Sequence, residues 1–65
     1  MRVSKNDIVK REAAVVEVFH EALKAGQTPT VAMAQDALVA LDGRKMRPVR
    51  ILELKQTVVD QFTTV

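Results

Sequence analysis

A short basic run is the feature of this sequence that most clearly suggests chemistry. The run spans residues 44–50 and contains no acidic residue. Its four cations are Arg44, Lys45, Arg47 and Arg50. Pro48 lies inside the run and is typical of the first turn of a helix. Two of the arginines therefore fall at a predicted helix N-terminus, where a cation opposes the helix dipole at a cost of roughly a few tenths of a kcal/mol. Cations and free backbone N–H groups at a helix start are suited to holding an anion.

Double-stranded DNA is the predicted partner of this run. Phosphates are the anions that such cations contact, and one of the arginines can read guanine through a bidentate pair. Arg2 and Lys5 extend the prediction as a flexible basic arm over residues 1–6. Other readings stay open, because the run is also compatible with a solvated loop or with an acidic protein partner, and the arm with a solvated terminus.

Catalytic and metal-binding patterns are missing from the sequence. There is no cysteine, and His20 is the single histidine. No hydroxyl lies in a nucleophile motif, and Gly26 and Gly43 do not form a phosphate-binding loop. We therefore expect no catalytic residue, no metal site, no cofactor and no small-molecule substrate, and predict that the protein is not an enzyme.

The first element that must position the basic run is a helix predicted over Asp7 to Ala25. Ile8, Val15, Phe19 and Ala22 recur at helical spacing on one stripe, and Gly26 provides the stop. Glu12 falls close to this stripe. We expect it to pair with a basic residue, within the chain or across a dimer.

Two further helices follow. Thr28 as cap and Pro29 at the first helical position predict a second helix from Pro29 or Thr30 to Leu41. The third helix is predicted from Pro48 to about Phe62, with residues 63–65 as a frayed tail. The Asp42-Gly43 pair leaves an alternative open, since it either ends the second helix or turns a short hairpin.

The expected fold is all-α: a compact three-helix domain spanning residues 1–65, helix–turn–helix-like and dimeric. The alternative fold is two helices with a short hairpin around Asp42-Gly43. A homodimer is expected because a 65-residue chain has a marginal core and lacks cysteines for a disulfide staple. The predicted dimer or partner interface is the apolar stripe of the third helix: Ile51, Leu54, Val58 and Phe62.

Hydropathy along the chain bears on where in the cell the protein is expected. No apolar run approaches the roughly 20 residues that span a bilayer, and the polar start of the chain does not resemble a signal peptide. We therefore expect no membrane association and a cytoplasmic protein.

The order of these elements resembles the N-terminal DNA-binding domain of plasmid KfrA-type proteins. The matching residues span Ile8 to Gln56. They are Ala22-Leu23, Gly26, Pro29-Thr30-Val31, Ala37-Leu38 and the helix that starts at Pro48. The segment from Val39 to Met46 is longer than the turn of that family, and the coiled coil that follows the domain in that family has no counterpart here. The resemblance implies a helix–turn–helix fold with Arg47 and Arg50 near the DNA.

Two functions are therefore predicted. The first is a small DNA-binding regulator of a phage, plasmid or bacterium, which contacts phosphates through residues 44–50. The alternative is a protein-interaction module or small assembly subunit that uses the apolar face of the third helix.

Overall fold

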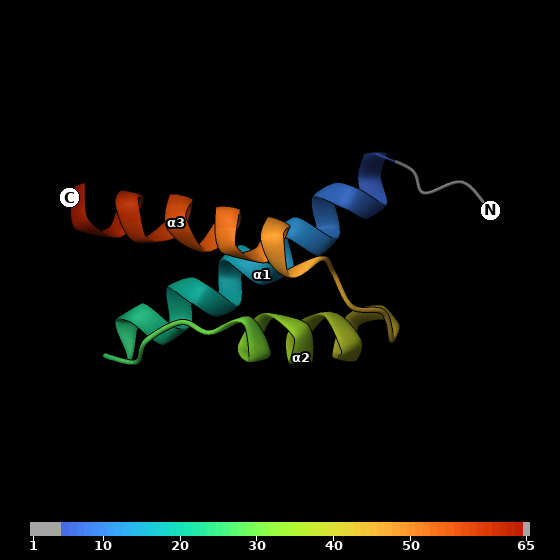
Figure 1. Cartoon of the computed structure of the whole chain (residues 1–65), viewed down its shortest axis with the longest axis horizontal. Helices are drawn as coiled ribbons and strands as arrows, with labels where there is room; N and C mark the ends of the chain where they lie inside the picture. Colours follow the sequence, from blue (N-terminus) through green and yellow to red (C-terminus); the bar gives the residue numbers. More distant parts are fainter. Residues whose placement is uncertain (1–4, 65) are drawn as a thin grey trace.

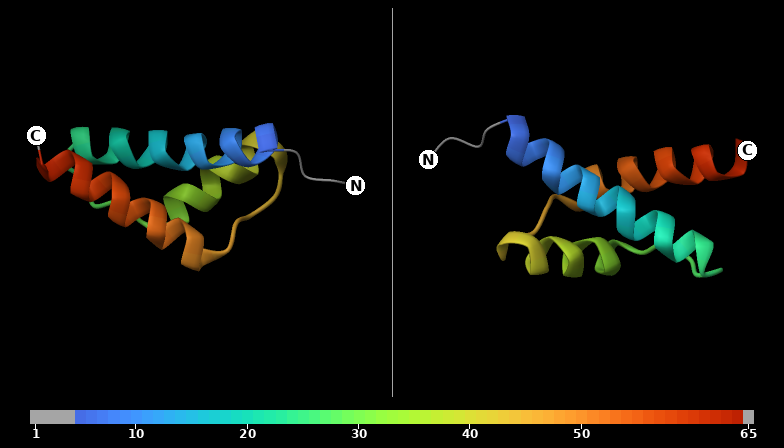
Figure 2. Two further views of the ribbon diagram at one scale, coloured as in Figure 1. Left: turned by 90° about the horizontal axis from the view of Figure 1, so that it is seen from above. Right: turned by 180° about the vertical axis from the view of Figure 1, so that it is seen from behind.

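Three helices make up the protein, and α1 is the one on which the other two pack. The computed structural model describes residues 5–64 and contains α1 (Lys5–Lys24), α2 (Val31–Asp42) and α3 (Pro48–Thr64), with no strand in that range. Both α2 and α3 lie on one side of α1 (Figures 1 and 2). The predicted all-α, three-helix fold is confirmed.

The ends of α1 differ slightly from the prediction. The helix begins at Lys5, two residues earlier than predicted, so Lys5 and Asn6 belong to α1 and not to an arm. Residues 1–4 of the predicted arm, including Arg2, lie outside the described residues, as does Val65 of the predicted tail. The other two tail residues, Thr63 and Thr64, belong to α3, so this helix extends past its predicted end at about Phe62. At the other end, Gly26 adopts a left-handed φ of 75° just beyond the helix, as its position predicts.

The start of α2 corrects the predicted cap. Thr30, in an extended conformation, is the N-cap: its hydroxyl oxygen accepts a hydrogen bond from the Met33 N–H at 3.2 Å. Thr28 therefore does not cap the helix, and Pro29 is a buried residue before it. The prediction failed because threonines on both sides of the proline suit an N-cap.

The end of α2 decides between the two predicted folds. Gly43 takes a φ of 77°, and its N–H donates to the Val39 carbonyl at 2.8 Å. This bond completes the last helical turn with glycine in the left-handed region that it tolerates best. Gly43 is thus a helix stop, and the alternative hairpin is wrong.

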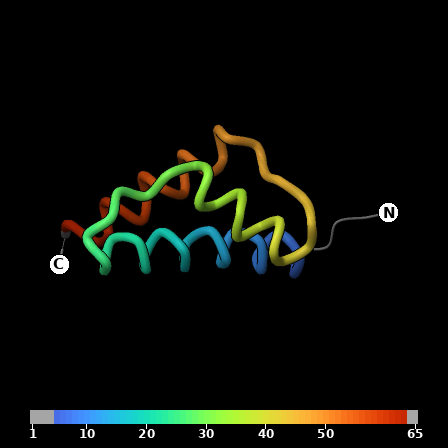
Figure 3. Tube along the Cα trace, turned by 90° about the horizontal axis from the view of Figure 1, so that it is seen from below, coloured from blue at the N-terminus to red at the C-terminus, as the bar shows by residue number. Residues whose placement is uncertain are grey.

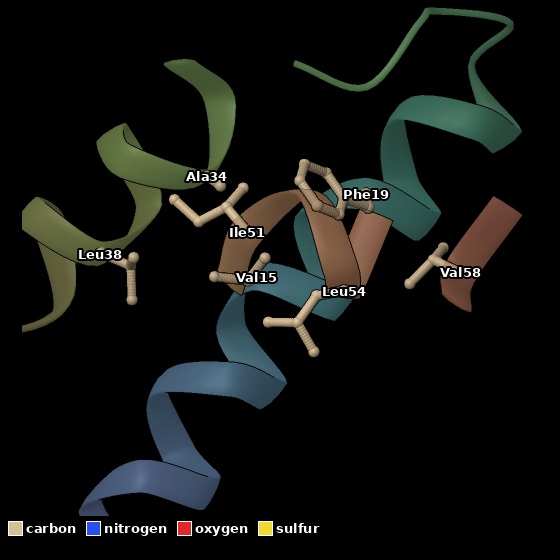
Figure 4. Close-up of a cluster of buried hydrophobic side chains, with 7 residues drawn as sticks. All are labelled: Val15, Phe19, Ala34, Leu38, Ile51, Leu54 and Val58. Atoms are coloured by element: carbon tan, nitrogen blue, oxygen red, sulfur yellow. The ribbon is translucent and has the colours of Figure 1, made fainter. Parts of the chain in front are cut away.

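The core contains side chains from all three helices and corrects the predicted interface. Ile51, Leu54 and Val58 are 0%, 8% and 0% exposed, and they converge with Val15 and Phe19 of α1 and with α2 (Figure 4). These three residues stabilise the chain's own fold and are not available to a partner. Phe62, the fourth residue of that prediction, is 44% exposed.

A five-residue loop joins α2 to α3 and bridges the part of the molecule where these helices separate. The two helices contact each other less than either contacts α1, and the loop at 43–47 arches between them (Figure 3). Arg44, Lys45 and Arg47 of the basic run lie on this loop, and Arg50 lies in the first turn of α3.

Within residues 5–64, none of the helices combines the length and the apolar character needed to cross a membrane.

Candidate nucleic-acid interface

A hollow of about 890 Å³ brings the predicted basic residues together. It lies between α1, the 43–47 loop and the first two turns of α3, and we call it the basic hollow. Its lining residues are Ile8, Arg11, Glu12, Arg44, Lys45, Met46, Arg47, Val49, Arg50 and Glu53. All four residues of the basic run are included, whereas Lys5 is not. Five cations face two carboxylates, so the hollow has an excess of positive charge.

Gln35 of α2 holds the middle of the loop. Its side-chain Nε2 donates to the Met46 carbonyl at 2.8 Å, and its Oε1 accepts from the Met46 N–H at 2.9 Å. Met46 itself packs against the core. Both backbone groups of a half-buried residue are thereby satisfied, which removes the cost of leaving them unpaired. The loop has a defined path although it contains no regular secondary structure.

Arg11 of α1 anchors the start of the same loop. Its guanidinium donates to the Lys45 carbonyl at 3.1 Å and to the Arg44 carbonyl at 3.4 Å, and forms an ion pair with Asp42. Asp42 also accepts from the Arg44 N–H at 3.0 Å. The hydrogen bond from Arg11, and then that from the Arg44 N–H, hold the pKa of the Asp42 carboxyl below its usual value. Arg11 therefore organises the site more than it offers charge to a ligand.

Sequence reasoning missed this role of Arg11, although a signal was present. Arg11 stands one helical turn before Val15 and so lies beside the apolar stripe of α1, and its side chain is only 12% exposed. A charged residue next to a buried stripe needs a partner on a neighbouring element. The sequence does not show which one, because Asp42 lies 31 positions away.

Arg50 is also largely neutralised. Its Nε and Nη2 donate to the two Glu12 carboxylate oxygens, both at 2.9 Å, and its Nη1 lies 3.6 Å from Glu53. The hydrogen bonds from Arg50 lower the pKa of Glu12, and the same contact raises the pKa of Arg50. The predicted pairing of Glu12 with a basic residue is confirmed, and the partner lies in the same chain.

Lys45 and Arg47 differ from the other cations of the hollow. Within residues 5–64, neither has a carboxylate oxygen within the 4.0 Å that defines an ion pair, and both are exposed. Arg44 is intermediate, since its guanidinium lies 3.9 Å from Asp42 and its side chain is 61% exposed. The uncompensated positive charge of the hollow is therefore concentrated at positions 45 and 47.

The start of α3 lies directly beside these two cations. Pro48 is the first helical residue, as predicted, and the Arg47 carbonyl accepts from the N–H groups of Arg50 and Ile51 at 3.1 and 3.2 Å. Arg47 thus occupies the N-cap position, where an arginine side chain has no acceptor to offer the helix. Its guanidinium remains available to an anion at the positive end of the helix dipole.

Comparisons with protein-family models, with curated proteins and with solved structures found no match to this chain. The resemblance to KfrA-type domains stays a prediction from the sequence.

Proposed function

We propose that this protein binds double-stranded DNA by placing backbone phosphates in the basic hollow. The observation that carries the proposal is the pair of uncompensated cations, Lys45 and Arg47, on a loop fixed by Gln35 and Arg11. Because the loop backbone is already ordered, contact with an anion costs side-chain entropy but little further backbone entropy. Lys45 and Arg47 are the main phosphate contacts of the proposal, and Arg44 is the third.

The shape of the hollow favours a polyanion over a small ligand. Of its lining residues, Arg11, Glu12 and Met46 are partly buried, and the other seven are exposed. A small molecule needs a pocket that covers most of its surface, whereas a DNA strand passes over an open surface and contacts successive phosphates. Val49, 71% exposed at the start of α3, stands next to this path and can contact a base methyl group.

A salt-dependent titration of a labelled duplex tests the proposal. Fluorescence anisotropy measured at low and at physiological salt should show binding that weakens steeply as salt increases, because bound cations release counterions from DNA. Lys45→Ala and Arg47→Ala should each lower the affinity and reduce the salt slope by about 1. Arg50→Ala is a poorer probe, since it also leaves Glu12 without its partner.

Lys24→Ala is the matched control. Lys24 is an exposed cation at the far end of α1, paired with Glu21 at 3.7 Å, and its removal changes the net charge by the same amount. The control should keep the wild-type affinity and slope. Absence of binding at low salt, or an equal loss of DNA affinity in all three variants, would reject the proposal. An acidic protein would then be the better candidate partner of the hollow.

A further inference from the structure

A second apolar stripe runs along α3 beside the one that enters the core. Leu52 is 51% exposed, Phe62 is 44% exposed, and Val59 is half-buried between them. Together with Lys55 they follow a 3-4-3 spacing, so they share one side of the helix. We call these four residues the outer flank. The fold of one chain leaves this flank incompletely covered.

We propose that the outer flank pairs with the same flank of a second copy of this chain, with the two α3 helices antiparallel and the two-fold axis level with position 57 along them. A two-fold dimer must use one patch that is complementary to itself. The spacing meets this condition, because positions 52 and 62, and positions 55 and 59, are each symmetric about 57. Leu52 then packs on Phe62 of the second copy at both ends. The stem of Lys55 covers Val59 of the second copy, while its ammonium stays in water.

The chain's own composition favours a second copy as the occupant. A 65-residue domain has a small core and commonly adds a disulfide, a metal or an association to be stable. The sequence contains no cysteine and one histidine, which leaves association as the available addition. Lys55 is the single charged residue of the flank, so the surface offers little charge with which to select a strongly acidic or basic partner.

The pairing would also place the two basic hollows at opposite ends of the paired α3 helices, and their joint use by one duplex rests on the proposed function. The two-fold axis of side-by-side antiparallel helices is perpendicular to the plane of the pair, so both copies present the same side of α3 in one direction. Val49, Glu53 and Arg50, which line the hollow, lie roughly 100°, 140° and 160° around α3 from the middle of the outer flank, at about 100° per residue. Val49 therefore borders the surface that the two copies share, and the rest of each hollow turns away from the second copy.

The distance between the hollows suits DNA. Pro48 lies nine positions before Thr57, which is roughly 14 Å along a helix, so the two Pro48 positions stand about 27 Å apart along the paired axes. The offset between the helices and the reach of the Arg47 side chain add to this value. Successive major grooves on one face of DNA are about 34 Å apart, close to the separation of the two loops.

The experiment measures mass by analytical ultracentrifugation without DNA, over a series of protein concentrations. The wild type should be a dimer. Leu52→Glu and Phe62→Lys should each give a monomer, because a charge would face an apolar side chain of the second copy. The double variant L52E/F62K should dimerise again, since the antiparallel register places each introduced carboxylate opposite an introduced ammonium.

Val39→Glu is the control, because Val39 on α2 is as exposed as Phe62, at 44%. It should leave the dimer intact, and circular dichroism should show that every variant keeps its helices. A monomeric wild type, dimeric single variants, or a monomeric Val39→Glu protein would overturn the proposed interface. The duplex titration of the Lys45 and Arg47 variants is a separate measurement, so each proposal can be rejected without rejecting the other.

Discussion

Four of the five cations that line the hollow divide into two groups by their partners, and Arg44 is intermediate between the groups. Arg11 and Arg50 are held by Asp42 and Glu12 and connect segments far apart in the sequence. Lys45 and Arg47 have no such carboxylate within residues 5–64 and keep their charge for a ligand. The first group is structural and the second is suited to recognition. Residue type alone does not separate them, because arginine occurs in both.

The two ion pairs predict how stability depends on pH. The pKa values of Glu12 and Asp42 lie below their ordinary values of 4.5 and 3.8 in the folded protein, so the unfolded chain takes up protons first as pH falls. Their stabilisation is present above about pH 4.5 and is lost as pH drops through the lowered folded values. Urea unfolding should therefore give a smaller free energy of unfolding at about pH 3 than at pH 7.

The variant E12Q/D42N should show a flatter pH dependence, because neither side chain titrates. Glu17→Gln serves as the control, since Glu17 is an exposed carboxylate of α1 with no ion pair within residues 5–64. An unchanged drop in stability for E12Q/D42N would show that these pairs do not couple folding to protonation.

At the scale of elements, the helix breaks were easier to predict than the helix starts. Gly26 and Gly43 end α1 and α2 as expected, because a left-handed residue after a helix strongly favours glycine. The predicted start of α2 was too early, because Thr28 and Thr30 offer the same capping hydroxyl on either side of Pro29. Burial of Pro29 is a tertiary contact, and local sequence patterns do not report it.

The position of the cap can be measured. Thr30→Ala removes the hydroxyl that accepts from Met33 N–H and should lower the free energy of unfolding by about 1 kcal/mol. Thr28→Ala should change it by less than about 0.5 kcal/mol, because Thr28 is an exposed residue outside the helix. Urea titrations of both variants provide the comparison. A larger loss for Thr28→Ala would place the functional cap at the position first predicted.

At the scale of the whole molecule, the sequence indicated how much apolar surface α3 carries but not how it is divided. Two stripes with helical spacing lie side by side, one at 51, 54 and 58 and one at 52, 59 and 62. Periodicity describes both stripes equally well, so it cannot tell which one faces α1 and α2. The pairing of Arg11 with Asp42 also could not be predicted from the sequence, because it depends on how α1 and α2 pack.

Truncation of one residue from each stripe should give very different stabilities. Ile51→Ala leaves a cavity at a fully buried position and should cost about 2–4 kcal/mol, a large part of the stability of a domain this small. Leu52→Ala at a half-exposed position should cost less than about 1 kcal/mol. Urea unfolding at low protein concentration, where a dimer dissociates, separates the two effects. Equal losses would contradict the assignment of the inner stripe to the core.

The two hydrogen bonds between Gln35 and Met46 affect how the surface of the 43–47 loop can change during evolution. The amide of Gln35 gives the loop the two hydrogen bonds that a neighbouring strand would give, and both bonds are made with backbone atoms of Met46. The path of the chain therefore does not depend on the side chains at positions 45 and 47. Those positions are free to vary in charge, size and reach while the scaffold stays constant. New binding preferences can thus arise by substitutions at the loop surface without a new fold.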